Sequence, residues 1–242
     1  MNAYRYLAQA YNNLMSDVDY DAWASYINSL LGQKELRLFE ASCGTGSITA
    51  RLYDMGHNVI ASDISPEMLD IAMCDARLHG RNIVFIQQDM RRLSAGNPMD
   101  AVVSACDGAN YLDQTGLKEF FSSAFTILKP GGKFLFDISS AHKLRSMDGQ
   151  VYYDDSDDAT CIWSNHYNKA ENKLLMDVLL FLREGDAFKK MCERHIQFAH
   201  DPVDIQKALS DIGFRHIEAY EAFTTDPAKS DSHRIQFACR KD

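Results

Sequence analysis

The sequence lacks long hydrophobic runs and has little clustered positive charge. No apolar run approaches the roughly 18 residues of a membrane-spanning helix, and no group of lysines and arginines is longer than a pair. The 242 residues carry 25 Lys and Arg against 34 Asp and Glu, a formal net charge of −9. Because nucleic-acid binders usually present a basic patch, we expect neither a nucleic acid nor a membrane as a partner.

Paired cysteines, repeats and linkers are also missing. The six cysteines include no C-x-x-C spacing, which is typical of zinc and redox sites. The first 21 residues contain acids and lack the basic start and apolar block of a signal peptide. We therefore expect reduced thiols, no bound metal and a cytoplasmic protein. Without repeats or a Pro- or Ser-rich linker, the length fits one α/β domain with a small accessory lobe.

Strand and helix signals alternate through the first half of the chain. Short apolar runs predict strands at Leu36–Ala41, Asn58–Ser62, Ile83–Ile86, Ala101–Ala105 and Lys133–Ile138. Amphipathic segments with capping residues predict helices at Tyr4–Met15, Asp21–Leu31, Thr45–Met55, Pro66–His79 and Thr115–Leu128. Nearly continuous apolar strands that alternate with helices indicate a parallel sheet covered on both faces.

After residue 140 the pattern changes to longer strands joined by turn-like segments. The runs at 161–167, 174–181 and 191–198 predict an antiparallel meander inserted after the fifth core strand. The acidic run at 154–158 is interpreted as a solvated turn. A helix that begins at Asp201-Pro202 and two closing strands, Phe214–Tyr220 and Ser232–Cys239, complete the prediction.

The strongest chemical signal is the segment 39–46, where the first strand meets a helix. Its glycines allow close approach of a ligand to the backbone, and the helix start offers free N–H groups. Asp63 ends the second strand, 17 residues after Gly46. A carboxylate at that place usually binds both hydroxyls of a ribose. This half of the chain is therefore predicted to bind an adenosine-containing ligand.

The same segment discriminates between adenosine ligands. A dinucleotide fingerprint that starts at Gly44 would need a glycine or alanine at its sixth position, where the chain has Thr49. The G-K-[ST] of a phosphate loop is missing. Glu40 would repel a pyrophosphate but suits a ligand with an ammonium group and a sulfonium. The pattern favours S-adenosylmethionine and leaves NAD as a poorly matched alternative.

These motifs resemble those of the class I S-adenosylmethionine-dependent methyltransferases. The segment 40–46 resembles the family's E/D-x-G-x-G-x-G loop, with Ser42 in place of the first glycine. The residues at 63–64, 88–90 and 105–107 resemble the ends of the second, third and fourth strands, which contact ribose, adenine and the methionine moiety. Leu128-Lys129-Pro130-Gly131-Gly132 resembles the family's turn before the fifth strand.

The resemblance implies a fold, a cofactor and a set of cofactor contacts. The implied fold is α/β and Rossmann-like: a seven-stranded, mostly parallel sheet with N-terminal helices and an antiparallel meander after the fifth strand. Residues 1–139 and 201–242 would form the core, and residues 140–200 an acceptor-site lobe. S-adenosylmethionine would be the cofactor and S-adenosylhomocysteine its product. The implied cofactor-binding residues are Tyr11, Glu40, Ala41, Cys43, Gly44, Gly46, Asp63, Ile64, Met68, Asp89, Met90 and Cys106.

A narrower resemblance covers nearly the whole chain. The opening around Tyr11 and the motif His195-Ile196-Gln197 resemble a subgroup of small-molecule N- and O-methyltransferases, which includes sugar-amine and glycine/sarcosine enzymes. In that subgroup the N-terminal helices and the meander close over the cofactor and form the acceptor pocket. The resemblance implies that Tyr11 closes over the cofactor, where an aromatic face would attract a sulfonium.

Candidates for acid–base work are few. His166, His195 and His200 are the possible bases, and His195 shares a strand face with Gln197 because side chains alternate along a strand. We predict His195 as an acceptor contact or general base, and Tyr111 as a residue that lines the acceptor site. Cys43 lies near a helix start, but no Cys-His-acid set accompanies it, so a small filling side chain is favoured over a nucleophile.

The predicted activity is in-line methyl transfer to a small molecule. An amine is favoured over a hydroxyl because the sequence shows neither an evident base nor a metal cluster. The N/D-P-P-Y/F motif of enzymes that methylate base amino groups is missing. An NAD(P)-linked oxidoreductase, a non-catalytic protein that binds the cofactor or its product, and a methyltransferase for protein side chains remain alternatives. We expect a monomer or homodimer.

Overall fold

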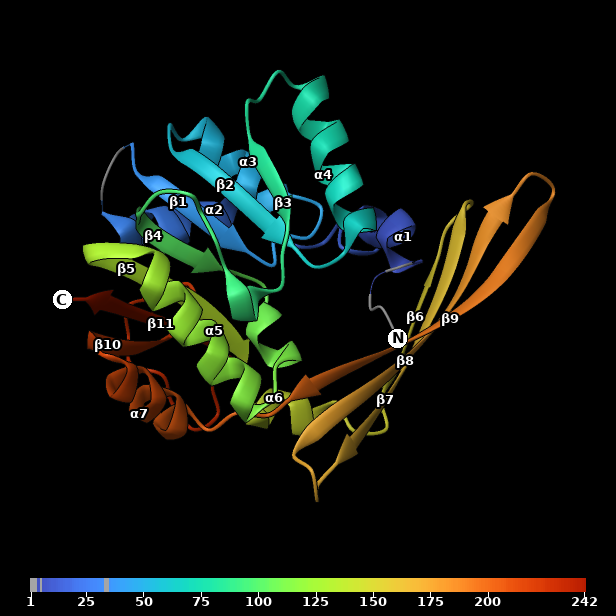
Figure 1. The fold of residues 1–242 in the computed structure, drawn as a ribbon. Coiled ribbons are helices and arrows are strands. Elements are labelled where there is room, and N and C mark those ends of the chain that lie inside the picture. Colours follow the sequence, from blue (N-terminus) through green and yellow to red (C-terminus); the bar gives the residue numbers. More distant parts are fainter. Residues whose placement is uncertain (1–3, 5, 33–34) are drawn as a thin grey trace.

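A seven-stranded sheet forms the centre of the molecule. The computed structural model describes residue 4 and residues 6–32 and 35–242, and its strand order is β10-β11-β5-β4-β1-β2-β3 (Figure 1). The first five strands are parallel, and the last two pair antiparallel beside β5. This confirms the predicted fold class. The strands are β1 Arg37–Ala41, β2 Asn58–Asp63, β3 Val84–Gln87, β4 Met99–Ser104, β5 Leu128–Ser139, β10 Phe214–Glu221 and β11 Arg234–Lys241.

Helices connect these strands and begin at capping residues. Ser65 accepts a hydrogen bond from the amide of Met68, and Pro66 occupies the first turn of its helix, as predicted. Asp113 and Asp201 cap two further helices in the same way. The α-helices are α1 Leu7–Leu14, α2 Tyr20–Leu31, α3 Ser47–Asp54, α4 Pro66–Leu78, α5 Gln114–Ile127, α6 Ala141–Ser146 and α7 Pro202–Ile212, with short 3₁₀ turns η1 at Met90–Arg92 and η2 at Gly108–Tyr111.

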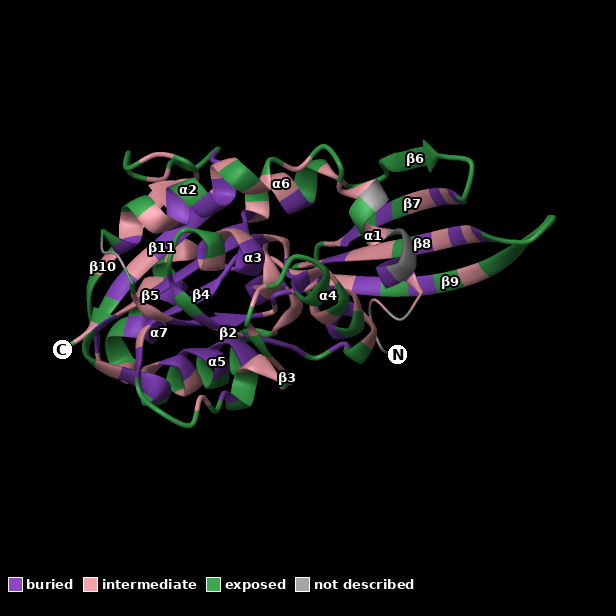
Figure 2. Cartoon of the chain, turned by 90° about the horizontal axis from the view of Figure 1, so that it is seen from above, coloured by how far each residue is buried: buried purple, intermediate pink, exposed green. Residues whose placement is uncertain are grey.

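The core has two apolar layers, one on each face of the sheet. Alternate strand residues such as Phe39 and Phe134 pack under α5 and α7, while their neighbours Leu38 and Leu135 pack under α2 and α3. Period-two alternation of apolar residues on both faces is what a sheet covered by helices requires. Figure 2 shows the buried central strands between more exposed helices.

A second, four-stranded antiparallel sheet follows β5 and projects from the core as a long twisted ribbon (Figure 1). We call this sheet the lobe. Leu7 of α1 packs against its buried residues Cys161, Val178 and Leu180, so the N-terminal segment bridges the lobe and the core. The lobe strands are β6 Val151–Asp155, β7 Ala159–Asn168, β8 Lys173–Glu184 and β9 Ala187–Phe198.

Several details of the prediction are wrong. The turn expected at residues 128–132 lies within β5, which begins at Leu128. The predicted meander lacked β6, and the acidic run was assigned to a turn, whereas Asp154 and Asp155 pair with β7 as the end of an exposed edge strand. An edge strand tolerates charged side chains because one of its sides faces water. The six-residue helix α6 was too short for its periodicity to be recognised. The first helix begins at Leu7 rather than at Tyr4.

Across the part of the chain that is described, we find no helix long and apolar enough to cross a membrane.

Candidate active site

The candidate site lies at the carboxyl ends of β1 and β4. The chain continues from β1 to β2 on one side and from β4 to β5 on the other, and ligands of open α/β sheets bind at such a reversal of strand order. A cavity of about 370 Å³ opens there. It is lined by the N-terminal segment, the loop after β1, the ends of β2 and β3, residues 105–116 and Phe198 of the lobe.

Ser42 gives the loop after β1 its local shape. Its backbone is left-handed, with a φ of 55°, a conformation that normally favours glycine. Its hydroxyl donates to the carbonyl of Ala41 at 2.6 Å and lies 2.8 Å from the hydroxyl of Ser104, so it joins β1 to β4. A Cβ atom on Gly108 would lie 2.2 Å from the Ser42 oxygen. The serine therefore fits this position because residue 108 is a glycine.

The loop glycines have different surroundings. Gly44 has a φ of 55° and lines the cavity. Gly46 has a φ of 79° at the start of α3, and a Cβ atom there would lie 3.0 Å from the Cβ of Ala72 in α4. Gly46 thus lies behind the loop, and Ala41 is buried within β1. Neither belongs to the cavity wall, although both were predicted as cofactor contacts.

Two buried carboxylates line the cavity. Glu40 is 2% exposed and accepts a hydrogen bond from the Thr49 hydroxyl at 2.5 Å. Burial raises the pKa of Glu40 to about 7. Asp63 accepts the backbone N–H groups of Gly44 and Ser65, each at 2.9 Å. Burial raises the pKa of Asp63, and these backbone hydrogen bonds oppose the rise.

Cysteine chemistry in the cavity is suppressed by burial. The thiol pKa of Cys43 is raised well above its usual range by burial and by the nearby Glu40 carboxylate, and burial likewise raises that of Cys106. Since the thiolate is the nucleophile, the structure supports the filling role of Cys43. No group of three or more His, Cys, Asp or Glu side chains in the described ranges is placed to hold a metal ion.

The end of the cavity away from the lobe is more open and is lined by residues that follow β2 and β3. Ile64 is 60% exposed, and Met68 and Met90 line the wall beside it. Asp89 caps η1 and forms an ion pair with Arg91 at 2.5 Å. That hydrogen bond lowers the pKa of Asp89, so its carboxylate stays charged. The predicted contacts at these four positions are all on the cavity wall.

Three tyrosines form the wall nearest the lobe, and we call Tyr4, Tyr11 and Tyr111 the tyrosine wall. The rings of Tyr4 and Tyr11 meet edge-to-face at 5.7 Å, and those of Tyr4 and Tyr111 lie 5.7 Å apart. The Tyr4 and Tyr111 hydroxyls are 2.6 Å apart. Burial raises the pKa of all three phenols, so the hydroxyls stay protonated.

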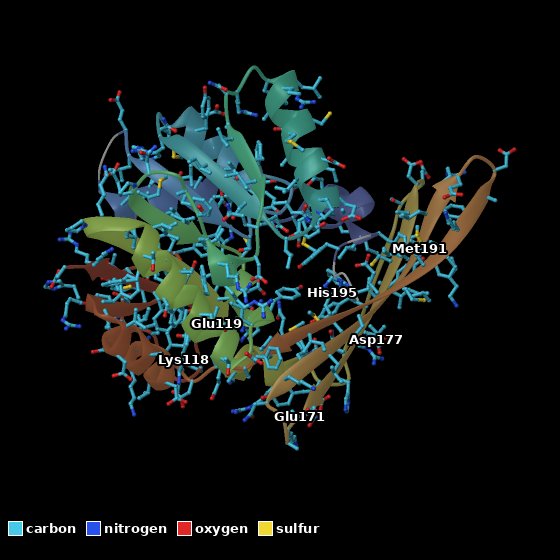
Figure 3. All side chains as sticks on the ribbon, viewed as in Figure 1. Lys118, Glu119, Glu171, Asp177, Met191 and His195 are labelled. Carbon is cyan, nitrogen blue, oxygen red and sulfur yellow. The ribbon has the colours of Figure 1, made fainter. Side chains whose placement is uncertain are left out.

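His195 lies behind this wall. Its side chain is 2% exposed, and Nδ1 lies 3.2 Å from the Tyr111 hydroxyl. Figure 3 labels His195 where the lobe strand approaches the core. The imidazole does not line the cavity and lies against two residues that do, Tyr4 and Tyr111. Its predicted neighbour on the strand face, Gln197, donates instead to Asp107 at 3.0 Å.

The other two histidines lie away from the cavity. His166 is exposed and pairs with Asp148, and His200 contacts the Leu112 carbonyl at 3.0 Å.

Sequence reasoning found fewer than half of the residues that line the cavity and missed the others. Some of the missed residues are direct neighbours of recognised motifs, and their adjacency to the motif could have identified them. The others are brought to the cavity by tertiary packing, for which the sequence holds no signal. The missed lining residues are Tyr4, Tyr20, Ser42, Thr45, Ser47, Ile48, Gln88, Arg91, Ala105, Gly108, Leu112, Asp113, Gly116 and Phe198.

Comparisons with known proteins agree with this geometry. Residues 39–132 match the family model described as a methyltransferase domain. An S-adenosylmethionine-dependent methyltransferase from Clostridium acetobutylicum ATCC 824 has the same fold, with a TM-score of 0.86, 28% identity and 99% of each chain covered. The "Putative methyltransferase YqeM" of Bacillus subtilis (strain 168) is 32% identical, over 98% of this chain and 97% of its own. The chain belongs to the class I S-adenosylmethionine-dependent methyltransferases.

The methyltransferase also shares its fold with more distant enzymes. A sugar N-methyltransferase, KedS8 from Streptoalloteichus sp ATCC 53650, is 17% identical, with a TM-score of 0.78 and 95% of this chain and 91% of its own covered.

The cavity fits S-adenosylmethionine chemically. Glu40 and Asp63 contribute carboxylates that form no ion pair within the described residues, and apolar side chains at the open end suit a flat base.

Proposed function

We propose that the methyltransferase acts on a small-molecule acceptor, and on an amine in preference to a hydroxyl. The tyrosine wall carries this proposal. It closes the cavity on the lobe side with aromatic faces and two hydroxyl oxygens. Aromatic faces attract cations, and methylation of an amine keeps a positive charge at the reacting centre as it passes from sulfur to nitrogen. A hydroxyl acceptor would instead have to lose its proton and carry negative charge beside the same wall.

The chain's own residues supply binding and orientation. Glu40 would bind the ammonium group of the cofactor, Asp63 the ribose hydroxyls, and Asp89 with Met90 the adenine. When bound, S-adenosylmethionine supplies a methyl group already activated on a sulfonium. A well-held in-line geometry contributes roughly 7–11 kcal/mol to such a displacement. The protein therefore needs to exclude water and align two partners more than it needs an electrophile of its own.

Tyr111 and His195 would handle the proton of the acceptor. The acceptor nitrogen would gain the methyl group together with a positive charge. The acceptor nitrogen then releases a proton to the Tyr111 oxygen, which passes its own proton to Nδ1 of His195, 3.2 Å away. This assigns Tyr111 the contact and His195 the base, and it agrees with the burial of the imidazole behind the wall.

The shape of the site and the distant relative support a small acceptor. The cavity is closed on one side by the N-terminal segment and on another by the lobe, which leaves little room for a nucleic acid. The neighbour from Streptoalloteichus is named as a sugar N-methyltransferase, and amino sugars are therefore among the acceptors to be tried first.

Two measurements test the proposal in sequence. Calorimetric titration with S-adenosylmethionine and S-adenosylhomocysteine, with NADH as the control, is expected to show binding of the adenosyl ligands alone. An acceptor screen of amines, amino sugars, hydroxylated metabolites and peptides then follows release of S-adenosylhomocysteine. Turnover of amines supports the proposal. Turnover of hydroxyl compounds or peptides alone contradicts it, and cofactor binding without turnover of any acceptor favours the non-catalytic alternative.

A further inference from the structure

Glu193 of the lobe holds the N-terminal segment in place. It lies on β9 opposite Val178, and its side chain is 4% exposed. One carboxylate oxygen accepts the backbone N–H groups of Tyr6 and of Leu7, the latter at 3.1 Å. The other oxygen accepts the backbone N–H of Tyr4 at 3.0 Å. Glu193 therefore fixes the backbone that carries Tyr4 onto the cavity wall.

The same carboxylate contacts the imidazole of His195. Residues 193 and 195 point to one face of β9 because side chains alternate along a strand, and the second oxygen of Glu193 lies 3.2 Å from Nε2 of His195. Burial alone would raise the pKa of Glu193, but the hydrogen bonds from His195 and from the N-terminal amides lower it. The group is thus an ionised carboxylate, which can only accept hydrogen bonds.

An ionised Glu193 fixes Nε2 of His195 as a hydrogen-bond donor. Nε2 of His195 must carry a proton, and Nδ1 accepts when the imidazole is neutral, as the base role proposed above requires. The Tyr111 hydroxyl therefore donates its single proton to Nδ1 across 3.2 Å. Because that proton is then engaged, Tyr4 must be the donor in the 2.6 Å contact between the two phenols. Both hydroxyl protons then point toward His195. The Tyr111 oxygen keeps one further lone pair, which Gln197 also contacts, and the Tyr4 oxygen keeps two.

We propose that Glu193 is a positioning residue that fixes the hydrogen-bond direction of the Tyr4–Tyr111–His195 chain, so that the acceptor group must be a hydrogen-bond donor. An amine N–H satisfies this wall, whereas a carbonyl or ether oxygen would meet lone pairs. This inference rests on the proposed methyl transfer, because the proton released by the acceptor would move toward His195 along the same hydrogen bonds that select a donor.

The substitution E193Q makes a specific prediction because an amide has one acceptor and one donor side. If the amide oxygen keeps the two hydrogen bonds from Tyr6 and Leu7, the amide NH₂ replaces the oxygen that faced Tyr4 and His195. The NH₂ then donates to Nε2 and moves the imidazole proton to Nδ1. The backbone N–H of Tyr4 loses its acceptor, while those of Tyr6 and Leu7 keep theirs.

Nitrogen-15 spectra of the imidazoles and amide hydrogen exchange, both with S-adenosylhomocysteine bound, test this without a known acceptor. The His195 signals are assigned by their loss in H195Q. We expect the Nε2–H tautomer in the wild type, the Nδ1–H tautomer in E193Q, and loss of exchange protection at Tyr4 only. The control E184Q makes the same chemical change at an exposed site of the lobe and is expected to match the wild type.

Three outcomes overturn the inference: an Nδ1–H tautomer of His195 in the wild type, a wild-type imidazolium with both nitrogens protonated, or an unchanged tautomer in folded E193Q whose Tyr4 amide has lost exchange protection. If E193Q does not fold, the wild-type spectrum decides. With an amine that the wild type methylates, E193Q is expected to lower kcat at least ~10-fold at unchanged cofactor affinity. A wild type that methylates no acceptor contradicts the proposed function, but it leaves the spectroscopic result standing.

Discussion

The two ends of the cavity are built in different ways. The cofactor end uses short motifs at successive strand ends, and most of its contacts, such as Gly44 with Asp63, join neighbouring parallel strands. The tyrosine wall joins residues that are far apart in the sequence: 107 positions separate Tyr4 from Tyr111, and 84 separate Tyr111 from His195. One end is therefore set by local sequence, and the other depends on docking of the lobe and the N-terminal segment.

A buried charge cluster lies where the lobe meets the core. Arg234 pairs with Asp107 and Asp137, and Asp107 also accepts the side-chain amide of Gln197 from the lobe at 3.0 Å. The guanidinium attracts both carboxylates and holds the pKa of Asp107 below its usual range, although burial acts in the opposite direction. This cluster links the lobe to the core, so its removal is the most severe test of how the two ends of the cavity differ.

The largest effect is expected from R234M. It removes the guanidinium that pairs with Asp107 and Asp137 and leaves Lys143 as the nearby cation, and breaking a buried pair in this way costs about 3–5 kcal/mol. Urea denaturation should show that loss in the free energy of unfolding. The control R215M, on the exposed face of β10, should change it by less than about 0.5 kcal/mol. A loss below ~1 kcal/mol for R234M would show that the cluster does not stabilise the junction.

The cofactor end is tested by D63A. It removes the carboxylate predicted to bind the ribose and leaves the N–H groups of Gly44 and Ser65 without their acceptor. We expect the affinity for S-adenosylmethionine to fall about 100-fold, since charged hydrogen bonds contribute roughly 1.5–3 kcal/mol each. Calorimetry measures this, with D70A on the exposed face of α4 as the control. Near-normal affinity in D63A would refute the ribose assignment.

The tyrosine wall is tested by Y111F. It deletes the hydroxyl that connects Tyr4 to His195 and keeps the ring. Turnover of an amine should fall about 10–100-fold, the lower range for loss of a positioned proton-transfer group. Affinity for the cofactor should stay within twofold. The control Y153F changes an exposed phenol of the lobe. If Y111F lost cofactor affinity and amine turnover equally, the cofactor end and the tyrosine wall would not act independently.

The smallest effect is a pH dependence at Glu40. Burial raises its pKa to about 7 in the absence of the cofactor, and a bound ammonium group would favour the ionised form. Affinity for S-adenosylmethionine should therefore rise several-fold between pH 6 and 7.5, with release of a proton on binding. In E40Q affinity should be lower and independent of pH over this range. A rising profile in E40Q would assign the titration to another group.

The same raised pKa has a consequence for stability. Because Glu40 ionises at about pH 4.5 in the unfolded chain and at about pH 7 in the fold, the unfolded state loses this proton first. The contribution of Glu40 to folding therefore weakens as the pH rises from about 4.5 to 7 and stays at its lower value above that range.

Sequence analysis predicted the core well for a physical reason. Strand periodicity, the caps at Ser65 and Asp201, and the carboxylates at strand ends are all local features, and parallel strands bring their carboxyl ends to one edge of the sheet. His195 was predicted as an acceptor contact or general base, but its place behind the wall and the place of Tyr4 on it were not predictable, because both depend on how the lobe packs against α1. The edge strand β6 was missed because its two aspartates have low strand propensity.

The exposed edge strand β6 also bears on solubility. Its outer backbone groups face water, and Val151, Tyr152 and Tyr153 are exposed along it, a combination that invites another chain to add as a further strand. Asp154 and Asp155 end that edge with like charges, and Asp157 and Asp158 follow it. Two copies that approached through β6 would each bring these acids into a shared sheet. The acidic run thus acts as a gatekeeper against edge-to-edge aggregation.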